Sequence, residues 1–380
     1  MRIAILMLNI EKIDANKYYN SQAEGMAKAL ATEGNDVLVY HLIPDMEQER
    51  KIIYQETIRV CYIRTRHIGK HAIPKMSLLD KNIDCMIVCS DNYCAFPKVV
   101  KWCKKNNIKC LPYIGVLHSN NSNKCKRVLS TLLCNNIPHY RHMTVMVKSN
   151  QIAMELKQHG VDDVRVMPVG LDKERLNTKY ASEDIAKIKT TWNYTDEEEL
   201  ILFVGRLHIE KQPLLMLELF RRIYAGNSRA RLLIVGQGEL EEQVRKTIND
   251  YNLQGVVRME SQVPNERMWE LYCISRCFVN LNTHEIFGMA ILEAMYYGCI
   301  VLALRAPGPE MIIDNYRTGY LCDNIDELQK NMQSVLSSSV DKRQMSLRAA
   351  REIEDRFTWE TIIQDMQTVI EEGIEDGNKM

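Results

Sequence analysis

The stretch His284-Glu-Ile-Phe-Gly-Met-Ala-Ile-Leu-Glu-Ala-Met-Tyr-Tyr-Gly298 joins a predicted strand to a predicted helix. It follows the apolar run Cys277 to Leu281, which is typical of a buried strand. Gly288 marks the start of a helix, because the residues after it are apolar and form helices well. A strand, a short loop and a helix in this order are typical of an α/β fold.

Two carboxylates lie on either side of that helix start. Glu285 is expected on the loop and Glu293 one to two turns into the helix. The first N–H groups of a helix have no intrahelical partner and carry partial positive charge, so they are expected to receive an anion. The amides expected to do so are those of Phe287, Gly288, Met289 and Ala290. This arrangement suits a sugar nucleotide, with a diphosphate at the helix start and hydroxylated rings on both sides.

Strand and helix patterns alternate throughout the chain, which predicts parallel sheets wrapped by helices. The strands expected in the first half are Arg2–Leu8, Asp36–His41, Asp84–Cys89, Lys109–Leu117, His142–Val147 and Val164–Pro168, and the helices are Gln22–Thr32, Phe96–Lys105, Lys126–Cys134 and Asn150–His159. The strands expected in the second half are Leu200–Val204, Arg231–Val235, Val256–Met259, Cys277–Leu281, Ile300–Leu304 and Tyr320–Cys322. The helices expected there are Pro213–Tyr224, Leu240–Asn249, Ile325–Leu336, Lys342–Arg356 and Trp359–Glu372.

The alternation stops between Gly170 and Glu199, where the chain is polar and charged. A chain of 380 residues exceeds one ordinary core, so two domains are expected. We place them at 1–170 and 171–356, with a helical insertion after the link near Gly170 to Lys173. Two Rossmann-like halves facing each other would form a cleft at the carboxyl ends of their strands, where ligands of open α/β sheets bind.

Composition indicates a soluble globular protein, with 46% apolar and 26% charged residues. No run approaches the length of a membrane span, and Met1 to Ile10 is strand-like, so secretion is not expected. The twelve cysteines show no C-x-x-C spacing, which favours reduced thiols in the cytoplasm.

The two halves carry opposite charge. Met1 to Gly170 holds 24 Lys and Arg against 15 Asp and Glu, and the remainder holds 25 against 34. A basic first half would attract an anionic acceptor or the anionic inner face of a membrane; alternatively, the two halves attract each other. Its basic residues include Lys101, Lys104, Lys105, Lys109, Lys124, Lys126 and Arg127.

A candidate phosphate clamp follows the strand Leu200–Val204. Gly205 and Arg206 come directly after it, and Lys211 lies five residues further on. Arginine binds two phosphate oxygens in a fork and lysine adds a point charge, and neither needs a metal. The alternative is a solvated turn with incidental cations.

Two further glycine-containing turns follow strands. Gly236 and Gly238 form a Gly-x-Gly turn that would let the backbone approach a nucleotide, although many such turns bind nothing. Gly308 lies in Ala306-Pro307-Gly308-Pro309-Glu310, expected either beside a donor sugar or in a proline-stiffened loop near a helix start. His118 follows the strand Lys109–Leu117 and is either a catalytic-site residue or a structural histidine.

Motifs for other chemistries are absent from the sequence. There is no Gly-x-Ser-x-Gly, no His-Glu-x-x-His, no Walker loop and no Asp-x-Asp pair for a divalent ion. We therefore expect no metal and no cofactor. Protein cations and helix amides would stabilise the charge on a leaving group instead.

Taken in order, Val204-Gly205-Arg206 with Lys211, Val235-Gly236-Gln237-Gly238 and the stretch from Glu285 to Gly298 resemble glycosyltransferase family 4, the retaining GT-B enzymes. The resemblance is strong over Leu200 to Leu321 and looser before it. It implies that the last helix, from Phe357 onward, crosses back onto the first domain. Two departures, Ile286 and Ala306-Pro307 at positions where the family often has glycines, bear on the choice of donor sugar.

The resemblance implies a role for each residue. Arg206 and Lys211 would hold the donor diphosphate, Glu293 would accept from the ribose, Glu285 would contact the sugar, and His118 would lie nearest the transferred sugar. The implied activity is metal-independent, retaining transfer of a hexose-type sugar from a UDP- or GDP-sugar. The acceptor would be a glycan, lipid-linked or other hydroxyl group, in polysaccharide or glycolipid biosynthesis. No nucleic acid would take part. The alternatives are a sugar-nucleotide epimerase and a non-catalytic partner of another transferase.

Overall fold

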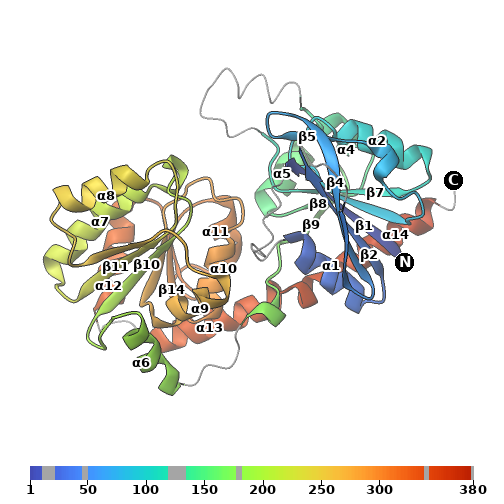
Figure 1. The fold of residues 1–380 in the computed structure, drawn as a ribbon. Helices are drawn as coiled ribbons and strands as arrows, with labels where there is room; N and C mark the ends of the chain where they lie inside the picture. The colour runs from blue at the N-terminus through green and yellow to red at the C-terminus, as the bar shows by residue number, and fades with distance from the viewer. Residues whose placement is uncertain (11–21, 45–49, 119–133, 177–181, 338–341, 378–380) are drawn as a thin grey trace. The chain divides into compact units, whose positions relative to one another are not determined.

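The computed structural model describes residues 1–10, 22–44, 50–118, 134–176, 182–337 and 342–377. The chain divides into two compact units, of which the first comprises Met1–Gly170 and Trp359–Met380 and the second Leu171–Thr358. The first boundary lies after Gly170, where the sequence placed it. The second lies after Thr358, two residues beyond the expected end at residue 356. Each unit consists of a sheet with helices packed on its faces (Figure 1).

The first unit contains a nine-stranded sheet among the described residues. Parallel pairings give the order β4-β2-β1-β6-β7-β8-β9. Strand β3 pairs antiparallel with β4, and β5 pairs antiparallel with the ends of β4 and β1. The strands are β1 Arg2–Ile10, β2 Asp36–Ile43, β3 Arg50–Gln55, β4 Ile58–Ile68, β5 His71–Pro74, β6 Cys85–Cys89, β7 Lys109–Ile114, β8 Val145–Val147 and β9 Val164–Val166.

The last helix of the chain packs on the first unit. A Cβ built on Gly25 of α1 would lie 2.2 Å from Nε1 of Trp359 in α14, so only glycine allows this contact. Asn35 also donates to Gln367 at 3.0 Å. The helices of this unit are α1 Gln22–Thr32, α2 Phe96–Lys105, α4 Ile137–Tyr140, α5 Asn150–Gln158 and α14 Trp359–Gly377, with a 3-10 turn at Met76–Leu78.

The second unit has a fully parallel sheet in the order β12-β11-β10-β13-β14-β15. Its strands are continuous runs of apolar residues, as expected when both faces of a parallel sheet are covered. The strands are β10 Glu199–Val204, β11 Ala230–Val235, β12 Val257–Glu260, β13 Cys277–Asn280, β14 Ile300–Leu304 and β15 Tyr320–Cys322.

Helices cover both faces of this sheet. Figure 1 shows α7, α8 and α12 on one side and α9, α10 and α11 on the other. Phe220 and Met216 of α7 are fully buried in one core with Ile201 and Phe203 of β10. The helices are α6 Ser182–Thr191, α7 Pro213–Gly226, α8 Glu241–Asp250, α9 Asn265–Ile274, α10 Met289–Tyr296, α11 Pro307–Ile312, α12 Ile325–Leu336 and α13 Lys342–Arg356, with 3-10 turns at Lys173–Arg175 and Ile209–Lys211.

Several elements differ from those expected. The sequence did not predict β3, β4, β5, α4 or α9, and residues 307–310, expected in a loop, form the first part of helix α11. Nearly all of the helix predicted at Lys126–Cys134 lies outside the described residues. In the part of the chain that the structure describes, no helix has the length and apolar character needed to cross a bilayer.

Candidate functional site

The predicted donor-site residues gather at one edge of the second sheet. Strands β10 and β11 lie in register with Val204 opposite Val235, so the loops that follow them start side by side at Gly205 and Gly236. The loop after β13 leads to α10. Because β13 pairs with β10, its loop lies next to the one that begins at Gly205.

Glycines let these loops pack directly on one another. A Cβ on Gly236 would lie 1.9 Å from the carbonyl oxygen of Gly205, and one on Gly238 would lie 2.5 Å from that of Leu207. Leu207 N–H also donates to the Gln237 carbonyl at 3.0 Å. The Gly-x-Gly turn predicted to approach a nucleotide is therefore needed first for contact between loops.

The start of helix α11, which follows β14, packs against the start of α10 in the same way. A Cβ on Gly308 would lie 2.0 Å from the carbonyl oxygen of Phe287. The Gly308 N–H donates to the Glu285 carbonyl at 2.8 Å. Gly308, predicted beside a donor sugar, thus contacts the backbone of the residues before and after Ile286 and fixes their position.

Lys211 and Glu285 form an ion pair that joins the two loops. The Lys211 Nζ donates to Glu285 Oε2. The amides of Asn280 and Asn282 donate to the same oxygen at 3.1 and 3.3 Å. Both asparagines are buried, and the sequence analysis missed them, although two amides at the end of an apolar strand are a recognisable polar signal. Glu285 is thereby held in one orientation.

Arg206 contrasts with Lys211. Its side chain is exposed, and among the residues that the structure describes it has no hydrogen-bond or ion-pair partner. A guanidinium with all five donors available can bind an anion in a fork. The site therefore combines a free cation with a neutralised pair.

Gly288 caps helix α10 in a conformation that favours glycine. Its φ is 103°, in the left-handed region. The first turn of α10 contains no acidic residue that would occupy its N–H groups. The N–H groups at this helix start, including those of Met289 and Ala290, are the ones predicted to receive an anion.

Glu293 lies further along α10, partly buried. The Tyr272 hydroxyl from α9 donates to Glu293 Oε2 at 2.9 Å. Burial raises the pKa of Glu293 from 4.5 to about 7, and the hydrogen bond from Tyr272 lowers it in part. Tyr272 could not be linked to Glu293 from sequence, because the contact depends on the packing of α9, a helix that was not predicted.

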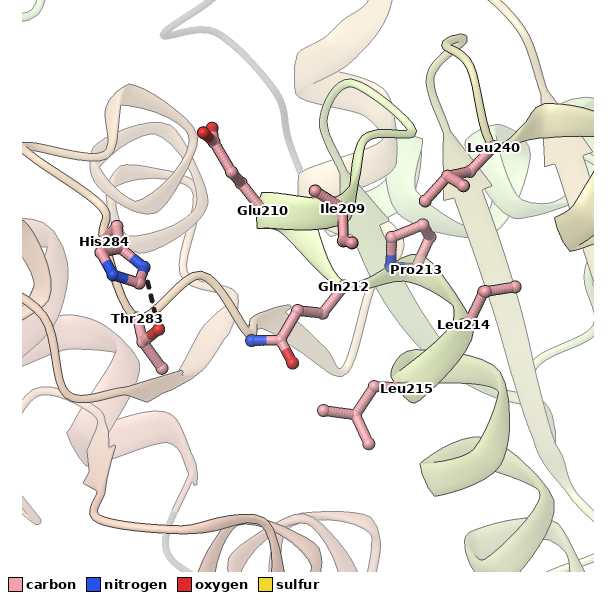
Figure 2. Close-up of a pocket in the computed structure, with 9 residues that line it drawn as sticks. All are labelled: Ile209, Glu210, Gln212, Pro213, Leu214, Leu215, Leu240, Thr283 and His284. Carbon is pink, nitrogen blue, oxygen red and sulfur yellow. Dashed lines mark hydrogen bonds between the residues drawn. The ribbon is translucent and has the colours of Figure 1, made fainter. Parts of the chain in front are cut away.

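A hollow of about 480 Å³ is lined by residues close to Lys211 and Glu285 in the chain. Figure 2 shows Thr283 and His284 on one side of it and Ile209, Pro213 and Leu214 on the other. The neighbours of Lys211 in the chain also line it, as do the two residues before Glu285. The complete lining is Ile209, Glu210, Gln212, Pro213, Leu214, Leu215, Leu240, Thr283 and His284. The sequence analysis assigned none of these residues to the site.

His118 belongs to the first unit, in the loop after β7. It is exposed and hydrogen-bonded through Nε2 to Glu155 of α5. At the neighbouring strand ends, Lys148 Nζ lies 3.4 Å from Asp91 Oδ2. His118 therefore lies at the carboxyl edge of the first sheet, as expected, and its predicted contact with a transferred sugar stays a prediction.

Residues 184–352 match the family model described as "Glycosyl transferases group 1". That segment contains every predicted donor-site residue described above. Residues 184–352 therefore form a domain similar to the group 1 glycosyl transferases. The enzyme class predicted from sequence, glycosyltransferase, is confirmed for this domain.

Curated relatives agree with the family match. A sulfoquinovosyl transferase of Arabidopsis thaliana is 26% identical over 222 residues, 56% of this chain and 41% of that protein. An uncharacterised glycosyltransferase of Methanocaldococcus jannaschii is 21% identical over 369 residues, 93% of both chains. The chain thus spans less than half the length of the first relative and nearly all of the second.

Solved structures resemble both units together. Anabaena HepE, solved in complex with UDP-glucose, has a TM-score of 0.76 at 15% identity and covers 98% of this chain and 100% of its own. The predicted fold, the GT-B fold with two Rossmann-like domains, is confirmed by this match.

Proposed function

We propose that this glycosyltransferase domain acts in a retaining transfer of a hexose-type sugar from a nucleotide sugar to a hydroxyl acceptor, without a metal ion. The observation that supports this most is the arrangement of Arg206, the Lys211–Glu285 pair and the α10 N-terminus at one sheet edge. Arg206 and the N–H groups of the α10 start have no acidic partner among the described residues, which suits a departing diphosphate. Carboxylates nearby suit hydroxyl groups.

The proposed reaction needs no protein nucleophile. The bond from the anomeric carbon to the phosphate oxygen breaks, and a bond from that carbon to the acceptor oxygen forms on the same face. The acceptor proton passes to the departing diphosphate. Arg206 and the α10 amides stabilise the negative charge on that leaving group, and Lys211 also holds Glu285 toward the sugar.

The donor is proposed to be a UDP- or GDP-sugar, with Glu293 accepting from the ribose. UDP-glucose is the first to test, because HepE was solved with it. Thermal stabilisation by a panel of UDP-, GDP- and ADP-sugars tests the proposal directly. If no nucleotide sugar raises the Tm, the donor-site proposal fails. NMR of the product then reports the anomeric configuration, and a chelator should leave turnover unchanged.

Arg206→Ala is the most informative variant for this test, because the Arg206 side chain has no partner among the described residues. It should abolish or weaken the stabilisation without lowering the Tm of the free protein. Arg229→Ala is a matched control, since Arg229 is also exposed but precedes β11 at the opposite edge of the same sheet. Equal binding by both variants would contradict the proposed site.

We further propose that helix α2 contacts an anionic membrane. Its buried side is formed by Phe96, Val99 and Cys103. Its exposed residues include Lys98, Lys101, Lys104 and Lys105. Lys98, Lys101 and Lys105 share one face, because they are three and four residues apart in sequence. Such a face is attracted to anionic lipid by about 1 kcal/mol per basic residue near the surface.

Flotation with liposomes that contain phosphatidylserine tests this contact. The double variant Lys101→Glu/Lys105→Glu should lose binding, whereas Lys70→Glu/Lys157→Glu makes the same charge change at exposed positions outside α2. Equal binding by both variants would favour a diffuse charge effect. High salt should weaken binding of the wild-type protein.

A further inference from the structure

Helices α9 and α10 are joined by a hydrogen bond that ends at the predicted ribose-binding carboxylate. The Tyr272 hydroxyl donates to Glu293 Oε2 at 2.9 Å, and the two residues lie 21 positions apart in the chain. Among the described residues, no group donates to the other carboxylate oxygen, Oε1. One oxygen is therefore held by the protein and the other is available to a ligand.

The ring of Tyr272 is fixed in place. It is 1% exposed. It stacks on Tyr297 of the α10 C-terminus with ring centres 6.2 Å apart and planes at 6°. On another side it packs against Phe278 of β13 at 6.2 Å and 58°. A ring held on two sides presents its hydroxyl from one direction, so it orients the carboxylate and does not simply follow it.

The charge of Glu293 depends on this contact. The carboxylate is withdrawn from water, which favours its neutral form. A neutral carboxyl is a weaker acceptor for ribose hydroxyls than a carboxylate. The hydroxyl of Tyr272 favours the charged form, because a hydrogen bond to a carboxylate is stronger than one to a neutral oxygen.

We propose that Tyr272 is a positioning residue for the nucleotide-sugar donor, which holds one carboxylate oxygen of Glu293 and aims the other at the ribose. This inference rests on the proposed function, since it assumes that Glu293 meets the ribose. Tyr272 acts only through Glu293 and touches no reacting atom.

The test replaces only the hydroxyl. Tyr272→Phe keeps the stacked ring, and loss of a hydrogen bond to a charged group should weaken UDP-glucose binding by roughly 10- to 100-fold at pH 7. The KM should rise by the same factor, and kcat at saturating donor should change little. The pH at which donor affinity is half-maximal should move upward by about 1 unit, because more alkali is needed to ionise Glu293.

Two comparisons separate positioning from simple damage. In a Glu293→Gln background the Tyr272→Phe change should have no further effect on affinity, because Gln carries no charge to stabilise. Tyr140→Phe is the matched control: it removes another buried tyrosine hydroxyl, which lies 3.1 Å from Ser90 in the first unit, and should leave donor affinity unchanged.

The outcomes are distinct from those for the proposed function. If no nucleotide sugar binds the wild-type protein, the proposed function fails and this inference fails with it. If UDP-glucose or another sugar of the panel binds the wild type, and Tyr272→Phe binds equally with the same pH profile, only the role of Tyr272 is overturned. If Tyr272→Phe still lowers donor affinity in the Glu293→Gln background, the role of Tyr272 is overturned as well. Because this comparison is made within one background, it remains informative if Tyr272→Phe alone folds poorly.

Discussion

Lys211 donates a hydrogen bond to Glu285, so the residue predicted to hold the diphosphate and the residue predicted to contact the sugar are bonded to each other. The pair joins the loop after β10 to the loop after β13. A lysine placed in this way stabilises the fold and the proposed leaving group together. Arg206 has no such double role.

Substitution of these two cations should therefore give different results. Lys211→Ala should slow turnover by about 2 to 4 kcal/mol, roughly 30- to 1,000-fold, through lost leaving-group stabilisation. It should also lower the Tm, because it leaves Glu285 partly buried without its cation at a cost of about 1 to 3 kcal/mol. Arg206→Ala should slow turnover with an unchanged Tm. Steady-state kinetics and thermal melts of the two variants check these expectations, with exposed Lys246→Ala as the control. Normal turnover in Lys211→Ala would remove Lys211 from the mechanism.

Gly308→Ala should destabilise the second unit. Its Cβ would overlap the Phe287 carbonyl oxygen, which is backbone and cannot move aside without moving the α10 start. Forcing an extra carbon into a packed site costs about 1 to 3 kcal/mol or more. Gly255→Ala is the control, since nothing lies within 4 Å of its Cβ position. Equal urea midpoints for the two variants would disprove this close packing.

The sequence predicted the parts of the fold whose pattern is local. The bounds of β14 at Ile300–Leu304 and of α12 at Ile325–Leu336 agree with the prediction, because one is an uninterrupted apolar run and the other has a capping asparagine and helical periodicity. Strand β4, Ile58–Ile68, was missed because several arginines interrupt it. Its identity as a strand depends on pairing with β2 and β3, which no local pattern records.

The site was predictable as residues but not as contacts. Glu285 and Lys211 are identifiable from their motifs, yet their ion pair depends on the pairing of β10 with β13. The approach of Gly236 to a ligand stays a prediction, and the structure adds a contact that no motif records, because Gly236 makes room for the Gly205 carbonyl. The partner of Glu293 depends on packing between helices, which follows from the complete fold.

Gly25→Ala should separate α14 from α1. The methyl group would meet the indole ring of Trp359, which is 2% exposed and has little room to turn. We expect a loss of about 1 to 3 kcal/mol in the first unit, as for other overpacked sites. Limited proteolysis should cleave α14 sooner than in the wild-type protein. Glu33→Ala, an exposed change beside the end of α1, is the control, and an uncleaved α14 in Gly25→Ala would refute the expected separation.

The raised pKa of Glu293 makes the stability of the second unit depend on pH in a direction opposite to that of most carboxylates. The folded protein holds this proton up to a pKa of about 7, and the unfolded chain releases it near 4.5. The folded state thus binds more protons between these values, so its free energy of unfolding falls as pH rises from 4.5 to 7 and levels off above 7. The loss is at most about 3 kcal/mol.

Glu293→Gln should remove this dependence, because glutamine does not titrate and can still accept from Tyr272. The variant should match the wild-type protein near pH 5 and exceed it in stability at pH 8, while its donor affinity falls. Urea unfolding at pH 5, 6, 7 and 8 measures the difference, with Glu242→Gln on the exposed side of α8 as the control. A stability difference that stays constant across this range would show that Glu293 is already ionised at pH 5 in the folded protein. The proposed dependence of its charge on Tyr272 would then have no basis.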